Sequence, residues 1–257
     1  QEYLAQYLNG VLNSYLASYF LFLTASVWGV ERDKVEPNDL LRFPLPMPTE
    51  DNEYLVAHIV ELGKKLGSSQ SQSTVNETKT LLNNAVFDLY DLSEVERILV
   101  KDTVNYTIDF RMKREASKAL DPPENEELIA YSSQLIDAIK PFLQTLNEMT
   151  IVADIFETKT APLQVVKFSL VPVPGRALPT QVITGQVLDD VLKKIATQLP
   201  VKLADTIYTR RNLRIYSGRE FYIIKSVQRR YWNRSAALSD ADTIISEQMK
   251  ANYAAVR

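Results

Sequence analysis

The chain contains no cysteine, which excludes disulfide bonds and metal sites built from thiolates. It contains one histidine, His58, so nearly every catalytic or metal-binding arrangement based on histidine is excluded as well. The seven glycines never form Gly-x-Gly, and a glycine-rich loop that cradles a nucleotide is therefore not expected. We interpret His58 as a surface or packed residue rather than as a catalytic base.

The net charge of −3 conceals an uneven distribution of charged residues. Residues 202–235 contain nine Lys or Arg and two acidic residues, a balance of +7, and residues 236–257 have a balance of −1. The rest of the chain therefore has a balance of −9. A basic segment in an otherwise acidic protein indicates either a polyanionic partner or pairing with the acidic remainder.

The N-terminal stretch lacks charge, because no charged residue lies between Glu2 and Glu31. Its apolar residues recur at three- and four-residue steps, as in an amphipathic helix. The dense apolar part, Tyr15–Leu23, is short for a membrane span, and the basic region of a secretory signal is missing. We predict one core helix and no membrane partner, with a buried stripe of Leu4, Leu8, Val11, Leu12, Tyr15, Leu16, Tyr19, Phe20 and Leu23.

Further amphipathic helices are predicted over 50–66, 81–113 and 128–148, the second in two pieces. The polar segment GSSQSQST, residues 67–74, is typical of a flexible linker, and two prolines in 120–127 mark a boundary. Within the second helical region, Ser93 and Glu96 form a capping box that starts its second piece.

The pattern changes after residue 127. Segments TIVADIF (150–156) and LQVVKFSLV (163–171) favour strands, and a helix is predicted from Thr184. Residues 206–227 are predicted to form a hairpin turning at Ser217-Gly218, followed by a helix from Ser239-Asp240. We expect an α+β fold, with amphipathic helices and a C-terminal domain of two strand pairs alternating with helices.

Several motifs in the first 110 residues carry a resemblance to a known family. In order they are Leu12-Asn13-Ser14, Trp28-Gly29-Val30, Asp39-Leu40-Leu41, Pro44-Leu45-Pro46-Met47-Pro48 and, within LLNNAVFDLYDLSEVERILVKD (81–102), Tyr90-Asp91-Leu92-Ser93-x-x-Glu96. This series resembles the end of the target-recognition domain, and the segment after it, in bacterial N6-adenine DNA methyltransferases of restriction–modification type. Asp91 stands where that pattern usually has glycine.

The resemblance implies a DNA-positioning region of a cytoplasmic methyltransferase in a restriction–modification or phage-defence system. Residues 1–66 would be the end of a target-recognition-like domain with a spacer helix, 67–119 a linker and helical connector, and 120–257 a C-terminal α+β domain. Because the chain starts with Gln1, we expect a fragment whose catalytic domain, with its S-adenosylmethionine site, lies elsewhere. This chain would have no catalytic residue, metal or cofactor of its own. Its partners would be double-stranded DNA and the methyltransferase domain or partner subunits.

The segment 208–235 mixes guanidinium groups with aromatic rings, which suits phosphate contacts and base stacking. Alternatively, its aromatic residues belong to the core and its arginines pair with the acidic remainder. The residues predicted to bind nucleic acid are Arg210, Arg211, Arg214, Arg219, Lys225, Arg229, Arg230, Tyr231, Trp232 and Arg234.

Two further motifs suggest enzymes, each incompletely. The segment DPPE (121–124) approaches the Asp/Asn-Pro-Pro-aromatic motif of adenine methyltransferases, but Glu124 cannot stack on a base, so we interpret it as a linker. The segment DIFETK (154–159) contains part of a metal-nuclease pattern without a convincing second acid. An interaction or scaffold domain of a defence complex is therefore the main alternative function, and a metal-dependent nuclease is the third.

Overall fold

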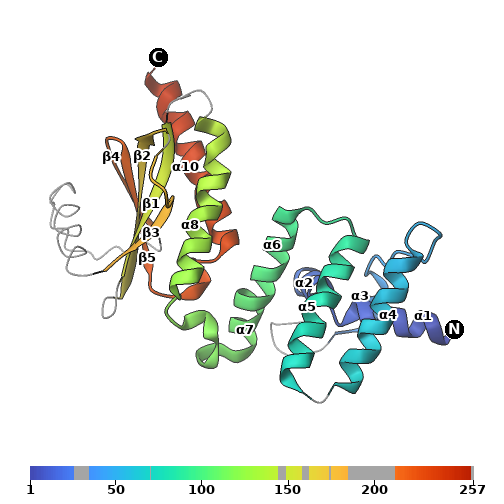
Figure 1. The fold of residues 1–257 in the computed structure, drawn as a ribbon. Coiled ribbons are helices and arrows are strands. Elements are labelled where there is room, and N and C mark those ends of the chain that lie inside the picture. Colours follow the sequence, from blue (N-terminus) through green and yellow to red (C-terminus); the bar gives the residue numbers. More distant parts are fainter. Residues whose placement is uncertain are drawn as a thin grey trace. The chain divides into compact units, whose positions relative to one another are not determined.

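The computed structural model describes residues 1–25, 35–69, 71–143, 149–157, 162–173, 175–184 and 212–255. The chain forms two compact units, Gln1–Ser117 and Lys118–Arg257 (Figure 1). The division lies close to the boundary expected at residue 120, but it does not separate 1–66 from 67–119.

The described part of the first unit is helical. Its elements are α1 (Glu2–Leu12), α2 (Tyr15–Thr24), α3 (Pro37–Leu41), α4 (Glu53–Ser68), α5 (Gln72–Leu89), α6 (Glu94–Asp102), the π-helix η1 (Thr103–Ile108), α7 (Asp109–Lys113) and the 3₁₀ turn η2 (Arg114–Ala116). The core of this unit combines α1, α2, α4 and α5, with Tyr7, Val56, Ile59, Leu82 and Val86 among its buried residues.

The single N-terminal helix predicted from the sequence is instead two helices, α1 and α2. The chain breaks at Asn13-Ser14, where Ser14 caps α2 by accepting a hydrogen bond from the backbone N–H of Ala17 at 3.2 Å. The two halves therefore do not share one stripe, and the predicted core residues Leu4, Leu8 and Leu23 are exposed. No helix within the described ranges combines the length and the apolar character that crossing a membrane requires.

Helices α1 and α4 cross closely at Gly10 and Gly63. A Cβ atom added to Gly10 would lie 2.7 Å from Cγ2 of Ile59, and one added to Gly63 would lie 3.3 Å from Cα of Gly10. Such small residues let two helix backbones approach, so Ile59 of α4 packs directly against α1.

The predicted linker 67–74 is mostly helical, which corrects the sequence interpretation. Helix α4 continues to Ser68 and α5 begins at Gln72. In the first turn of α5, polar side chains form hydrogen bonds along the helix surface. Gln72 donates to Asn76 at 3.0 Å and Ser73 donates to Glu77 at 3.2 Å. Spacings of four residues stabilise helices even where apolar residues are missing.

The second unit is an α+β fold, as predicted. It contains the 3₁₀ turn η3 (Lys118–Leu120), α8 (Asn125–Ile139), the 3₁₀ turn η4 (Lys140–Leu143), β1 (Met149–Phe156), β2 (Leu163–Pro172), β3 (Thr180–Ile183), β4 (Asn212–Ser217), β5 (Glu220–Ser226), the 3₁₀ turn η5 (Arg229–Tyr231) and α10 (Arg234–Ala255). The strand order is β3-β1-β2-β5-β4, and only the β1–β3 pairing is parallel among the described strands.

Helices α8 and α10 cover one face of the sheet (Figure 1). Alternate strand residues such as Ile155, Phe168 and Ile223 point into this core, together with Leu135 of α8 and Ala241 of α10. The opposite face has a smaller buried cluster that consists of Phe156, Val165, Tyr222 and Ile224.

Three boundaries in this unit differ from the predictions, and one strand was not predicted. Helix α10 begins at Arg234 rather than at Ser239, because the side chain of Asn233 accepts a hydrogen bond from the N–H of Ala236 at 2.8 Å. The short strand β3 was not predicted, and the first C-terminal helix ends at Ile139, before Pro141. The hairpin turns at Gly218, which has a φ of +59°, and Arg219, one residue later than the predicted turn at Ser217-Gly218. The helix predicted from Thr184 lies outside the described residues.

Candidate nucleic-acid interface

Two of the ten residues predicted to bind nucleic acid are buried, and for these the prediction is wrong. Lys225 is 2% exposed and Trp232 is fully enclosed. Lys225 donates a hydrogen bond to the carbonyl of Tyr231 at 3.0 Å, and Nε1 of Trp232 donates to the carbonyl of Ser226 at 2.9 Å. Neither side chain can reach a phosphate or a base. Arg210, Arg211 and the Trp28-Gly29-Val30 motif lie outside the described residues.

Lys225 belongs to a buried network centred on Asp240 of α10. The carboxylate of Asp240 pairs with Lys225 and with Nη2 of Arg214 at 3.1 Å, and it accepts a hydrogen bond from the hydroxyl of Tyr131 at 2.6 Å. Burial lowers the pKa of Lys225 and raises that of Tyr131; Asp240 acts against the first shift and adds to the second. The Lys225 ammonium also lies 4.8 Å from the Tyr131 ring centroid and 5.2 Å from that of Trp232. Through their ion pairs with Asp240, Arg214 of β4 and Lys225 of β5 thus join the sheet to α10.

Arg229 is also held internally, at the start of α8. Its guanidinium pairs with Glu124 and lies 3.1 Å from Oε2 of Glu127. Glu124 and Glu127 form the capping box of α8, so the DPPE segment leads into the start of this helix.

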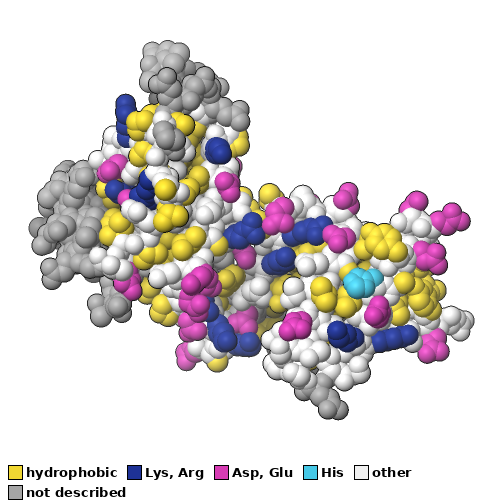
Figure 2. Space-filling model, in the orientation of Figure 1, with side chains coloured by type: hydrophobic (Ala, Val, Ile, Leu, Met, Phe, Trp, Pro, Cys, Tyr) yellow, Lys and Arg dark blue, Asp and Glu magenta, His cyan; other side chains and the backbone are white. Residues whose placement is uncertain are grey.

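Six of the predicted residues retain some exposure: the ion-paired Arg214 and Arg229, and also Arg219, Arg230, Tyr231 and Arg234. Arg230 stacks over Tyr231 at 4.7 Å and bonds Gln228 at 2.9 Å, and Arg234 bonds Gln134 at 3.0 Å. On the face drawn in Figure 2, Lys and Arg side chains lie among Asp and Glu rather than in one basic patch. Of the described cations in this segment, Arg214, Lys225 and Arg229 pair with acidic residues of the second unit.

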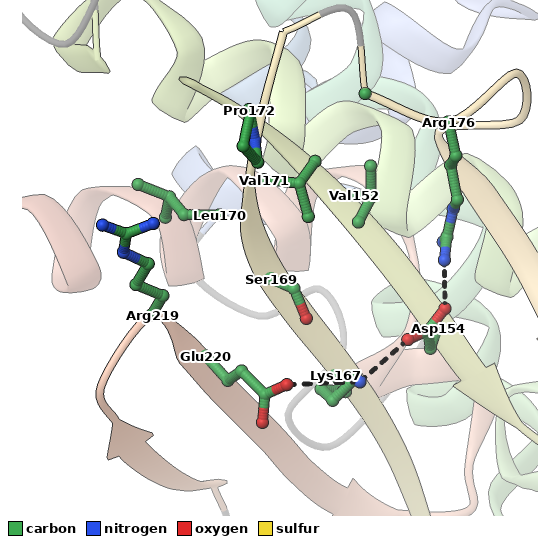
Figure 3. A pocket seen from close by; sticks show the side chains of 11 residues that line it. Val152, Asp154, Lys167, Ser169, Leu170, Val171, Pro172, Arg176, Arg219 and Glu220 are labelled. Atoms are coloured by element: carbon green, nitrogen blue, oxygen red, sulfur yellow. Dashed lines mark hydrogen bonds and ion pairs between the residues drawn. The ribbon is translucent and has the colours of Figure 1, made fainter. Parts of the chain in front are cut away.

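The acidic residue of the nuclease-like motif is paired with cations on the sheet face opposite α8 and α10 (Figure 3). Asp154 lies 3.1 Å from Nζ of Lys167 and 2.5 Å from Nη1 of Arg176, and Lys167 also lies 3.5 Å from Glu220. Burial by itself would raise the pKa of Asp154, but the hydrogen bonds and charges of Arg176 and Lys167 outweigh it and lower this pKa. Lys159 of the same motif lies outside the described residues, and His58 is exposed at the surface (Figure 2).

A different polar site lies in the first unit. A hollow of about 340 Å³ is formed where α2, α5, α6 and η1 meet. Tyr15 and Thr80 contribute to its wall, and no carboxylate is among the described residues that line it. The remaining lining consists of amides and ammonium groups, from Asn76, Asn83, Asn84, Asn105, Lys79 and Lys101.

One lining residue of the hollow, Asn83, is held by a hydrogen bond to another helix. The side-chain oxygen of Asn83, a buried residue of α5, accepts a hydrogen bond from the N–H of Tyr15 at 2.7 Å and so joins α5 to the start of α2. Burial raises the pKa of the neighbouring Tyr15 hydroxyl, which therefore stays protonated and able to donate. Asn105 belongs to η1, and π-helical segments frequently occur at functional sites.

The cations at this hollow are available to a ligand. Neither Lys79 nor Lys101 forms an ion pair within the described part of the chain, and Lys101 contacts the ring of Phe87 at 5.5 Å. The amides of Asn84 and Asn105 likewise have no hydrogen-bond partner in the described ranges. Sequence reasoning missed this site because its residues come from four elements between positions 15 and 105. Only the Asn83-Asn84 pair stands out locally.

A lysine- and amide-rich site without acids is suited to bind an anion with hydrogen-bonding neighbours, such as a phosphate in a nucleic-acid backbone. Comparison of the chain with protein-family models, with curated proteins and with solved structures found no match.

Proposed function

We propose that this chain is the DNA-recognition and positioning region of a bacterial N6-adenine DNA methyltransferase of restriction–modification or phage-defence type. In this proposal it is non-catalytic by itself. A methyltransferase domain outside this chain provides S-adenosylmethionine and the chemistry, in the cytoplasm. The chain places double-stranded DNA, or a partner subunit, for that domain.

The contact between two of the family-like motifs supports this proposal. The hydroxyl of Tyr90 donates to the carbonyl of Pro44 at 2.7 Å, and that of Tyr7 donates to the carbonyl of Pro46 at 2.8 Å. Burial raises the pKa of Tyr7 to about 12, so the bond persists at neutral pH. The proline-rich segment and the Tyr90 segment, more than forty positions apart, are therefore parts of one structural unit.

The backbone at Asp91 supports the proposal at the point where the sequence departs from the family pattern. Asp91 has a φ of +50°, a conformation that favours glycine. The N–H of Leu92 donates to the carbonyl of Phe87 at 3.0 Å, and that of Asp91 to the carbonyl of Asp88 at 3.1 Å, as in a Schellman motif. Aspartate tolerates this conformation better than most other residues, which accounts for the substitution.

The proposal rests above all on the hollow between α2, α5, α6 and η1. It belongs to the unit that carries the family-like motifs, and its unpaired Lys79 and Lys101 can neutralise phosphates. Asparagine amides can donate to phosphate or sugar oxygens and can pair with the edge of adenine. The DNA contact is thus assigned to the first unit rather than to the basic segment 208–235.

The test is a measurement of duplex-DNA affinity as a function of salt concentration. In a variant with Lys79→Ala and Lys101→Ala, we expect weaker binding and a log–log salt slope smaller by about two, or roughly one per phosphate contact. The matched control removes Lys64 and Lys65, two exposed lysines of α4 in the same unit that do not line the hollow. The control removes the same formal charge, so it separates local contact from general attraction.

An unchanged slope in the Lys79/Lys101 variant, or an equal change in the control, contradicts the assignment to the hollow. If the chain binds no duplex DNA at all, the interaction or scaffold function becomes the better one. The observation that favours this second candidate is the exposure of Tyr3, Leu4 and Leu8 on α1, which leaves an apolar surface for a partner subunit.

A further inference from the structure

The second unit contains a groove that no part of the proposed DNA function uses. It has a volume of about 540 Å³ and lies between η4, α10 and the β4–β5 hairpin. This volume is within the range of small-molecule sites in proteins. Most of its lining is apolar, with Ile139, Phe142, Leu170, Ile245 and Met249 as its principal side chains.

Two of the apolar side chains that line this groove are half-exposed. Phe142 is 53% exposed and Met249 is 50% exposed. Burying such side chains against an apolar ligand is favourable, at about 25 cal/mol per Å² of apolar surface removed from water. An apolar ligand that binds in the groove would therefore gain free energy by burying surface that the described residues leave exposed.

Among the described residues that line the groove, two are charged, Arg219 and Glu220. Glu220 is neutralised by Lys167 at 3.5 Å and accepts a hydrogen bond from Tyr222 at 2.9 Å. Arg219, in contrast, is exposed and its side chain has no partner in the described part of the chain. Figure 3 shows its side chain beside Leu170 and directed away from Lys167.

We propose that this groove binds a small amphipathic anion, with its apolar chain or ring between Phe142 and Met249 and its carboxylate or equivalent head group paired with Arg219. The selectivity is for charge as well as for apolar surface, because Glu220, the acidic residue among the described lining, is already paired. The proposal is independent of the DNA contact, which lies in the other unit.

The test uses the whole chain and two probes that differ in charge, octanoate and octanol. Each probe displaces the fluorescent anion anilinonaphthalene sulfonate, and its affinity is read from the loss of fluorescence. Wild-type protein should bind octanoate more tightly than octanol. In Arg219→Gln, octanoate should bind roughly three- to fivefold more weakly, the usual size of one exposed ion pair, and octanol should be unaffected.

Two further variants keep the result interpretable. Phe142→Ser should weaken the binding of both probes. Because Phe142 is half-exposed, we expect this variant to fold, and circular dichroism checks that it does. Lys118→Gln removes an exposed charge near the far end of α8 and should change neither probe. The proposal is overturned if neither probe displaces the dye, or if Arg219→Gln affects octanoate and octanol equally.

Discussion

Asp91 occupies a backbone conformation that costs an L-residue free energy and that glycine adopts freely. We therefore predict that Asp91→Gly raises the free energy of unfolding of the first unit by about 0.5–1 kcal/mol. Asp91→Ala should lower it, because alanine lacks the short polar side chain that makes the left-handed conformation tolerable for aspartate. Urea denaturation of the three proteins measures the order; a more stable alanine variant would contradict the interpretation of the Schellman motif.

Individual charges show what sequence reasoning can and cannot predict at this scale. The count of cations in 202–235 was correct as a composition, but it contained no information about their partners. Lys225 and Arg214 meet Asp240 only because α10 packs against the sheet. Such long-range pairings depend on packing, so burial reversed the predicted role of Lys225 and of Trp232.

Among the elements, the crossing of α1 and α4 makes the sharpest prediction. In Gly10→Ala the new methyl group would lie 2.7 Å from Cγ2 of Ile59, closer than real contacts allow, and 3.0 Å from the Ile59 carbonyl oxygen, which is also tight. We expect a loss of about 1–3 kcal/mol in the free energy of unfolding, despite the better helix propensity of alanine.

Gly67 supplies the matched control for this substitution. It lies in the last turn of α4, and a Cβ atom there would meet no atom within 4 Å. Gly67→Ala should therefore stabilise the protein by up to about 1 kcal/mol. Thermal unfolding followed by circular dichroism shows whether each substitution lowers or raises the stability. If both variants shift the same way, the helices do not pack as closely as Gly10 and Ile59 indicate.

The elements were predicted unequally well, for physical reasons. Strands β1 and β2 were predicted because their sequences are runs of β-branched and aromatic residues, which are enriched in strands. The break at Ser14 was missed because the apolar spacing continues across it, even though serine is a preferred N-cap. The hollow was not predictable, because its lining residues meet only after α2, α5 and α6 have packed.

At the scale of the whole molecule, the two units have separate cores. The core of Gln1–Ser117 is built from helices, and that of Lys118–Arg257 from the sheet with α8 and α10. None of the three buried clusters found among the described residues contains residues of both units. Cooperative unfolding requires shared packing, so each unit is expected to unfold as its own cooperative element.

This independence can be tested with one core truncation in each unit. Leu82 and Leu135 are both fully buried, the first in the helical unit and the second in α8 of the other. Each Leu→Ala change should destabilise its own unit by about 2–5 kcal/mol through lost burial and a residual cavity. Differential scanning calorimetry of the full chain should then show one transition moved and the other in place, with the roles exchanged between the two variants. A single transition shifted equally by both would mean that the units share an interface large enough to couple them. The hollow in the first unit and the groove in the second would then respond to each other's ligands, whereas separate transitions predict that octanoate leaves the DNA affinity unchanged.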